Sequence, residues 1–101
     1  MEIAKYILQI LRTQPIVVFS WGFHNPIALT GNRGLKFQVN GFKYKGTVEV
    51  EYNEGSDLFD VYVGSKCIEG VYVDELVSVI DGEVERINDY QERVKETYNL
   101  I

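Results

Sequence analysis

Residues 35–52 read Leu35-Lys36-Phe37-Gln38-Val39-Asn40-Gly41-Phe42-Lys43-Tyr44-Lys45-Gly46-Thr47-Val48-Glu49-Val50-Glu51-Tyr52, two runs of alternating apolar and polar side chains joined by Asn-Gly. Asn and Gly both tolerate positive φ, so this pair predicts a two-residue type I′ turn at Asn40-Gly41. Such a turn sets Val39 opposite Phe42 and Lys36 opposite Lys45. The stretch therefore predicts a β-hairpin at the centre of the fold.

The alternation also assigns the two faces of this hairpin, because successive side chains of a strand point to opposite sides. We expect the apolar set to face the core and the polar set to face water. The expected core residues are Leu35, Phe37, Val39, Phe42, Tyr44, Val48, Val50 and Tyr52.

Short elements are expected before the hairpin. Residues 2–12 carry an apolar stripe at helical spacing and predict an amphipathic helix that ends before Pro15. The β-branched run Ile16–Trp21 predicts an inner strand. Residues 23–26 are expected to form a turn, and residues 27–29 a short strand.

After the hairpin, residues 58–63 predict a strand whose Phe59, Val61 and Val63 pair with Tyr52, Val50 and Val48, which places Asp60 beside Glu51. A short edge strand is expected at 67–69. Asp74 is the expected N-cap of a helix over residues 75–98, in which Gly82 marks a kink or a break.

The expected fold is α+β, in one domain spanning residues 1–101. It has an N-terminal helix, an antiparallel sheet of four or five strands built on the central Asn-Gly hairpin, and a long C-terminal helix across one face. The apolar seam of that last helix includes Val84, Ile87, Val94 and Tyr98. Such a seam either covers the sheet or pairs with a second copy to form a homodimer.

Charge is distributed unevenly along the chain. The net charge is −5, yet no acidic residue lies between Glu2 and Glu49. Residues 1–48 carry a surplus of five positive charges, and residues 49–101 a surplus of ten negative ones. Either the two halves neutralise each other, or the basic half meets an anionic partner.

A basic cluster is the main candidate binding surface. Lys36 faces Lys45 in the expected register, and like charges in this geometry destabilise a sheet, which can mark a functional site. Arg33 and Lys43 lie nearby, with Tyr44 and Trp21 as stacking groups for a nucleic acid. The pI near 4.8 disfavours nucleic acid and favours a protein partner.

Catalytic, cofactor and metal residues are not expected. His24 is the only histidine, and Cys67, the only cysteine, is expected to be a small buried hydrophobe. Glu49, Glu51 and Asp60 form an acidic cluster that could serve a metal-dependent enzyme, which is the third alternative. No Ca²⁺ loop pattern accompanies them.

Two short motifs, Leu58-Phe59-Asp60-Val61-Tyr62 and Gly70-Val71-Tyr72-Val73-Asp74-Glu75-Leu76, resemble a loose group of small bacterial proteins of unknown function from mobile elements and phages. The resemblance implies the order helix, strands, helix, and no activity. The sequence also lacks a signal-peptide pattern and a long apolar span, which predicts a cytoplasmic protein without a membrane segment. We therefore expect a small, non-enzymatic, protein-binding module.

Overall fold

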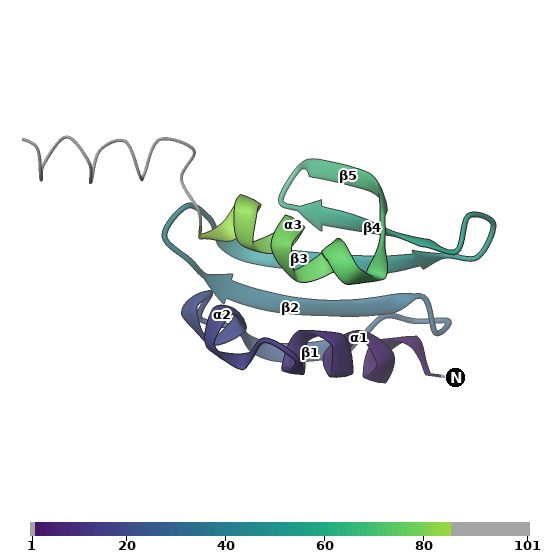
Figure 1. Cartoon of the computed structure of the whole chain (residues 1–101), viewed down its shortest axis with the longest axis horizontal. Coiled ribbons are helices and arrows are strands. Elements are labelled where there is room, and N and C mark those ends of the chain that lie inside the picture. The colour runs from purple at the N-terminus through teal and green to yellow at the C-terminus, as the bar shows by residue number, and fades with distance from the viewer. Residues whose placement is uncertain (1, 86–101) are drawn as a thin grey trace, which may run out of the picture.

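Three helices lie on one face of a five-stranded antiparallel sheet (Figure 1). The computed structural model describes residues 2–85. The helices are α1 (Ile3–Arg12), α2 (Pro15–Ser20) and α3 (Leu76–Val84), the last preceded by a 3₁₀ turn, η1 (Val73–Glu75). The strands are β1 (His24–Ala28), β2 (Gly34–Asn40), β3 (Lys45–Asn53), β4 (Leu58–Val63) and β5 (Lys66–Val71). The predicted α+β fold is confirmed.

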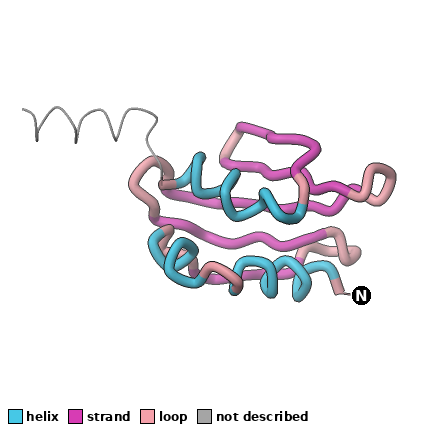
Figure 2. The backbone as a smooth tube through the Cα atoms, viewed as in Figure 1, coloured by secondary structure: helices cyan, strands magenta, loops and turns pink. Residues whose placement is uncertain are grey.

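The strands follow one another in space as they do in the chain, each joined to the next by a loop (Figure 2). Their apolar face and the helices enclose a single core. Its largest fully buried side chains are Trp21, Phe37, Ile7, Leu11, Leu35, Leu76 and Ile80. The opposite face of the sheet carries the polar set of the alternating pattern, so the division into a core face and a polar face is confirmed.

The predicted register of the central hairpin is wrong. Val39 pairs with Gly46 and Phe37 with Val48, whereas the Asn-Gly turn had set Val39 against Phe42. Residues 41–44 form a four-residue loop, and Phe42, expected in the core, is 71% exposed. The shift is by an even number of residues, so the apolar and polar sides of the two strands are unchanged.

The C-terminal end of α3 explains the longer loop. The carbonyl of Val84 accepts the backbone N–H groups of Lys43 and Tyr44 at 2.8 and 3.1 Å. The last carbonyls of a helix have no partner within the helix, so these bonds satisfy one of them. An added Cβ at Gly41 would lie 2.5 Å from Val84 Cγ1, so Gly41 permits close approach of α3.

The β3–β4 register is the predicted one. Phe59, Val61 and Val63 pair with Tyr52, Val50 and Val48. Glu51 lies opposite Asp60, also as predicted. The edge strand expected at 67–69 is longer, because β5 runs from Lys66 to Val71.

The strand predicted over Ile16–Trp21 is wrong, because this segment forms α2. Pro15 occupies the first turn of the helix, where its fixed φ is favourable and its missing N–H costs nothing. Gly22, at φ +67°, then turns the chain into β1. The turn expected at 23–26 is also wrong, since β1 begins at His24 and has an irregularity between His24 and Ile27.

The last helix differs from its predicted form at its start. Asp74 lies within η1, and the cap of α3, Glu75, makes no side-chain capping bond. The helix continues through Gly82 to Val84 without a break. The part predicted beyond residue 85 lies outside the described residues.

The observed register predicts that two phenylalanines of the hairpin differ sharply in their effect on stability. Phe37 is fully buried, so Phe37→Ala should lower the free energy of unfolding by about 3–5 kcal/mol. Phe42→Ala should change it by less than about 0.5 kcal/mol, because this side chain is mostly exposed. Urea denaturation followed by circular dichroism measures both. A large loss in Phe42→Ala would instead support the two-residue turn.

Gly82 offers a second test, because it lies in the interior of α3. An added Cβ would meet no atom within 4 Å. Gly82→Ala should therefore raise the free energy of unfolding by about 0.5–1 kcal/mol, through the better helix propensity of alanine. Gly41→Ala is the matched opposite case, because its Cβ collides with Val84, and it should destabilise the fold in the same urea titration.

Candidate functional site

The basic residues predicted to form a binding surface do not converge in the structure. Arg33 precedes β2, whereas Lys43 and Lys45 follow it, and a seven-residue strand spans roughly 20 Å. Lys36 lies opposite Glu49, so the predicted Lys36–Lys45 pair is absent and with it the reason to suspect a site there.

Two of these basic side chains are held by other partners. The Arg33 guanidinium binds Glu51 Oε1 at 2.9 Å and the carbonyl of Thr30 at 2.8 Å. Lys43 Nζ donates to the carbonyl of Gly82 at 3.0 Å. The Arg33–Glu51 pair joins the basic and acidic halves of the chain, so part of the charge asymmetry is neutralised inside the fold.

The two aromatic side chains proposed as stacking groups also make packing or hydrogen-bond contacts within the fold. Trp21 is fully buried, against the expectation of an accessible ring. Tyr44 is half-buried, and its hydroxyl donates to the carbonyl of Thr47 at 2.9 Å. Trp21 is therefore not accessible for stacking, and the hydroxyl of Tyr44 is engaged within the fold.

The acidic cluster lies on the polar face of the sheet. Glu51 binds Arg33, and Asp60 Oδ1 accepts the backbone N–H of Gly70 at 3.3 Å. Within residues 2–85 no group of three His, Cys, Asp or Glu side chains is arranged to hold a metal ion.

Tyr62 is the most perturbed ionisable group of the polar face. Desolvation, followed by the nearby Cys67 and Glu51, raises its pKa to about 12, because each disfavours the phenolate. A pKa raised in the folded state means that the unfolded chain loses this proton first. The contribution of Tyr62 to stability is therefore present below pH 10 and is lost as the pH rises towards 12.

This predicts a difference between the wild-type chain and Tyr62→Phe at high pH. Between pH 10 and 12 the melting temperature of the wild type should fall more steeply, because only its unfolded state gains the Tyr62 phenolate. The other six tyrosines are common to both proteins and cancel in the comparison. Differential scanning fluorimetry across this range gives the answer, and parallel curves would contradict the raised pKa.

His24 and Cys67 lie on opposite edges of the sheet, in β1 and β5. Four inter-strand spacings separate their backbones by about 19 Å, so they cannot act as a nucleophile and base pair. Cys67 is exposed, which corrects its assignment as a buried hydrophobe. His24 Nδ1 lies 2.7 Å from the carbonyl of Gly22.

The predicted dimer seam is divided between two regions. Val84 is fully buried within the described fold, beneath the β2–β3 loop, and is not available to a partner. Ile87, Val94 and Tyr98 lie outside the described residues. A dimer through this helix stays a prediction.

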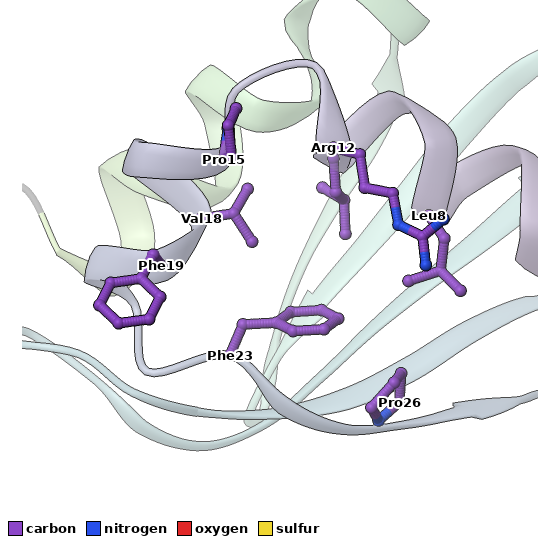
Figure 3. A pocket seen from close by; sticks show the side chains of 8 residues that line it. Leu8, Arg12, Pro15, Val18, Phe19, Phe23 and Pro26 are labelled. Atoms are coloured by element: carbon purple, nitrogen blue, oxygen red, sulfur yellow. The ribbon is translucent and has the colours of Figure 1, made fainter.

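An apolar hollow of about 280 Å³ lies where α1, α2 and β1 meet. We call it the α2 hollow. Figure 3 shows Phe23 projecting beneath the junction of the two helices, with Leu8 and Arg12 on one side and Phe19 on the other. Its lining consists of Leu8, Leu11, Arg12, Pro15, Val18, Phe19, Phe23 and Pro26.

The helix beside this hollow exposes unusually large apolar side chains. Ile16 and Phe19, three residues apart on one side of α2, are each 86% exposed. Of the six residues of α2, only Val18 is buried. The sequence reading missed this surface because it assigned the segment to an inner strand, where both side chains would be covered.

Comparisons with known proteins give no relative for this chain: no family model, curated protein or solved structure matches it. The resemblance of residues 58–62 and 70–76 to bacterial mobile-element proteins stays a prediction. Within residues 2–85, no helix is both long enough and apolar enough to cross a membrane.

Proposed function

We propose that this chain is a non-enzymatic protein-binding module that docks its partner on α2 and the α2 hollow. The observation that carries the proposal is the pair of exposed side chains, Ile16 and Phe19, beside a concave apolar surface. Exposed apolar side chains next to a groove are typical of a surface that another protein covers. Ile16 and Phe19 lie one helical turn apart. They fit a partner whose amphipathic helix lies in the α2 hollow with its apolar side against these two side chains.

Charge favours an acidic partner at this surface. From residue 3 to residue 48 the chain has no acidic residue. α2 and β1 have no formally charged side chain, and those of α1 and β2 are all cationic: Lys5, Arg12 and Lys36. Arg12 lines the hollow and is exposed, and within the described part of the chain no acidic group pairs with it. We therefore commit to a partner helix with apolar anchors and acidic flanks, because opposite potentials attract across an interface.

Selection of displayed helical peptides against the full chain tests this proposal. Enriched sequences should place apolar anchors at helical spacing beside Asp or Glu. Synthetic versions should bind at least about tenfold more weakly to Ile16→Ser/Phe19→Ser, because truncating a buried anchor costs 1–2 kcal/mol or more. Fluorescence anisotropy gives the affinities.

Phe42→Ser is the matched control, because Phe42 is also exposed but does not line the hollow. It should leave peptide affinity unchanged. Peptides that bind the double variant as tightly as the wild type would contradict the proposal. So would wild-type dimers, seen by sedimentation, that the double substitution dissociates, or a salt-sensitive nucleic-acid gel shift lost in Lys36→Glu/Lys43→Glu/Lys45→Glu.

A further inference from the structure

A second hollow, of about 330 Å³, lies near the N-terminal half of α1, between the β3–β4 loop and η1. We call it the tyrosine hollow. Its volume is at the lower end of the range of small-molecule sites. Its lining residues are Tyr6, Tyr52, Ser56, Asp57, Leu58, Phe59, Tyr72 and Val73, half of which carry aromatic rings.

Two of the tyrosine rings lie against a buried phenylalanine. Phe59 is 3% exposed, and its ring centroid lies 6.4 Å from that of Tyr6 and 5.5 Å from that of Tyr52. Tyr72 is 59% exposed at the same hollow. Four rings from α1, β3, β4 and the segment before η1 thus line one concave surface, although they are far apart in the sequence.

A single carboxylate is fixed beside these rings. Asp57 accepts a hydrogen bond from the Tyr52 hydroxyl, and its backbone N–H donates to the carbonyl of Asn53 at 2.8 Å. Asp57 has φ +58°, a conformation that aspartate tolerates better than most residues. The hydrogen bond to Asp57, followed by desolvation, raises the pKa of the Tyr52 hydroxyl above its ordinary value.

The surroundings of the tyrosine hollow are negative. Glu54 lies on the same loop as Asp57, and Asp74 and Glu75 follow Tyr72 in η1. Residues 49–85 hold eleven acidic residues and one basic residue, Lys66, which binds Glu83 at 2.8 Å. A cation is therefore attracted to this end of the molecule, and no lysine or arginine lines the hollow to compete with it.

We propose that the tyrosine hollow binds an alkylated ammonium group, with the cation over the faces of the tyrosine rings and beside the Asp57 carboxylate. Aromatic faces attract quaternary ammonium groups through the ring quadrupole, and a nearby carboxylate adds a full opposite charge. The group could be carried by a small amine such as choline or by a methylated lysine of a peptide. This site does not depend on the α2 hollow.

Nuclear magnetic resonance titrations of the ¹⁵N-labelled full chain test the proposal with two matched ligands. Choline carries the cation, and 3,3-dimethylbutan-1-ol has the same shape without the charge. Choline should shift the amides of Tyr52, Phe59 and Tyr72 and bind at least about fivefold more tightly than the alcohol. A glycine-serine peptide with one trimethyllysine distinguishes the peptide source: tighter binding than choline assigns the site to methylated lysine, and weaker binding to a free amine.

Substitutions distinguish the contributions of the Asp57 charge and of the tyrosine rings from that of the overall negative charge of this end of the molecule. Asp57→Asn keeps an acceptor for the Tyr52 hydroxyl and tolerates the positive φ, so it should weaken choline by about threefold or more without affecting the alcohol. Glu54→Gln removes the same charge from the same loop, outside the hollow, and should have a smaller effect. Tyr72→Phe should keep the preference for choline, and Tyr72→Leu should reduce it.

Three results would overturn the proposal. Equal affinity for choline and the alcohol would show an apolar hollow without cation recognition. Equal effects of Asp57→Asn and Glu54→Gln would assign the attraction to the overall negative field. Absence of saturable shifts at the tyrosine hollow with either cationic ligand would exclude the site. Failure of peptide binding at the α2 hollow changes none of these outcomes.

Discussion

The rest of the fold depends on the buried side chain of Trp21, which connects α2, the sheet and α3. Its ring lies against Phe37 of β2, with centroids 6.5 Å apart, and Nε1 donates to Asp81 Oδ1 of α3 at 2.9 Å. Its carbonyl accepts the backbone N–H of Asn40 at 2.7 Å. One residue thus fixes the end of α2 to the sheet and to the last helix, and a buried indole N–H left without its acceptor costs about 1–3 kcal/mol. The short α2 is stable because of this anchor, since a six-residue helix is not stable alone.

The same anchor explains why α2 can expose Ile16 and Phe19. With Trp21 and Val18 buried, the helix is held by one side only, and the opposite side is free to face outward. In a strand, the β-branched run would have required hydrogen-bonding neighbours on the sheet. That edge of the sheet is instead occupied by β1, His24–Ala28, whose residues are all exposed. Ile16 and Phe19 are therefore exposed because α2 is attached to the rest of the fold through Val18 and Trp21.

The sequence predicts best where one periodic pattern is enough. The amphipathic α1, the β3–β4 register and the two faces of the central strands follow from alternation and helical spacing, and all agree with the structure. The β2–β3 register fails because Asn40-Gly41 was read for its turn propensity. Gly41 is needed for the close approach of Val84, and neither Asn40 nor Gly41 has the positive φ that a type I′ turn requires. That contact joins residues more than forty positions apart, and no local rule contains it.

The separation of charge along the chain becomes a separation in space, because the meander keeps sequence order across the sheet. The basic half forms α1, α2, β1, β2 and the start of β3, and the acidic half forms the rest of β3 with β4, β5 and α3. Arg33–Glu51 neutralises part of the boundary where β2 meets β3. Away from that boundary each half keeps its sign, with Arg12 at the α2 hollow and Asp57 at the tyrosine hollow. One cationic side chain lines the α2 hollow and one carboxylate lines the tyrosine hollow. The ligands proposed for the two hollows therefore carry opposite charge, and occupancy of one need not exclude the other.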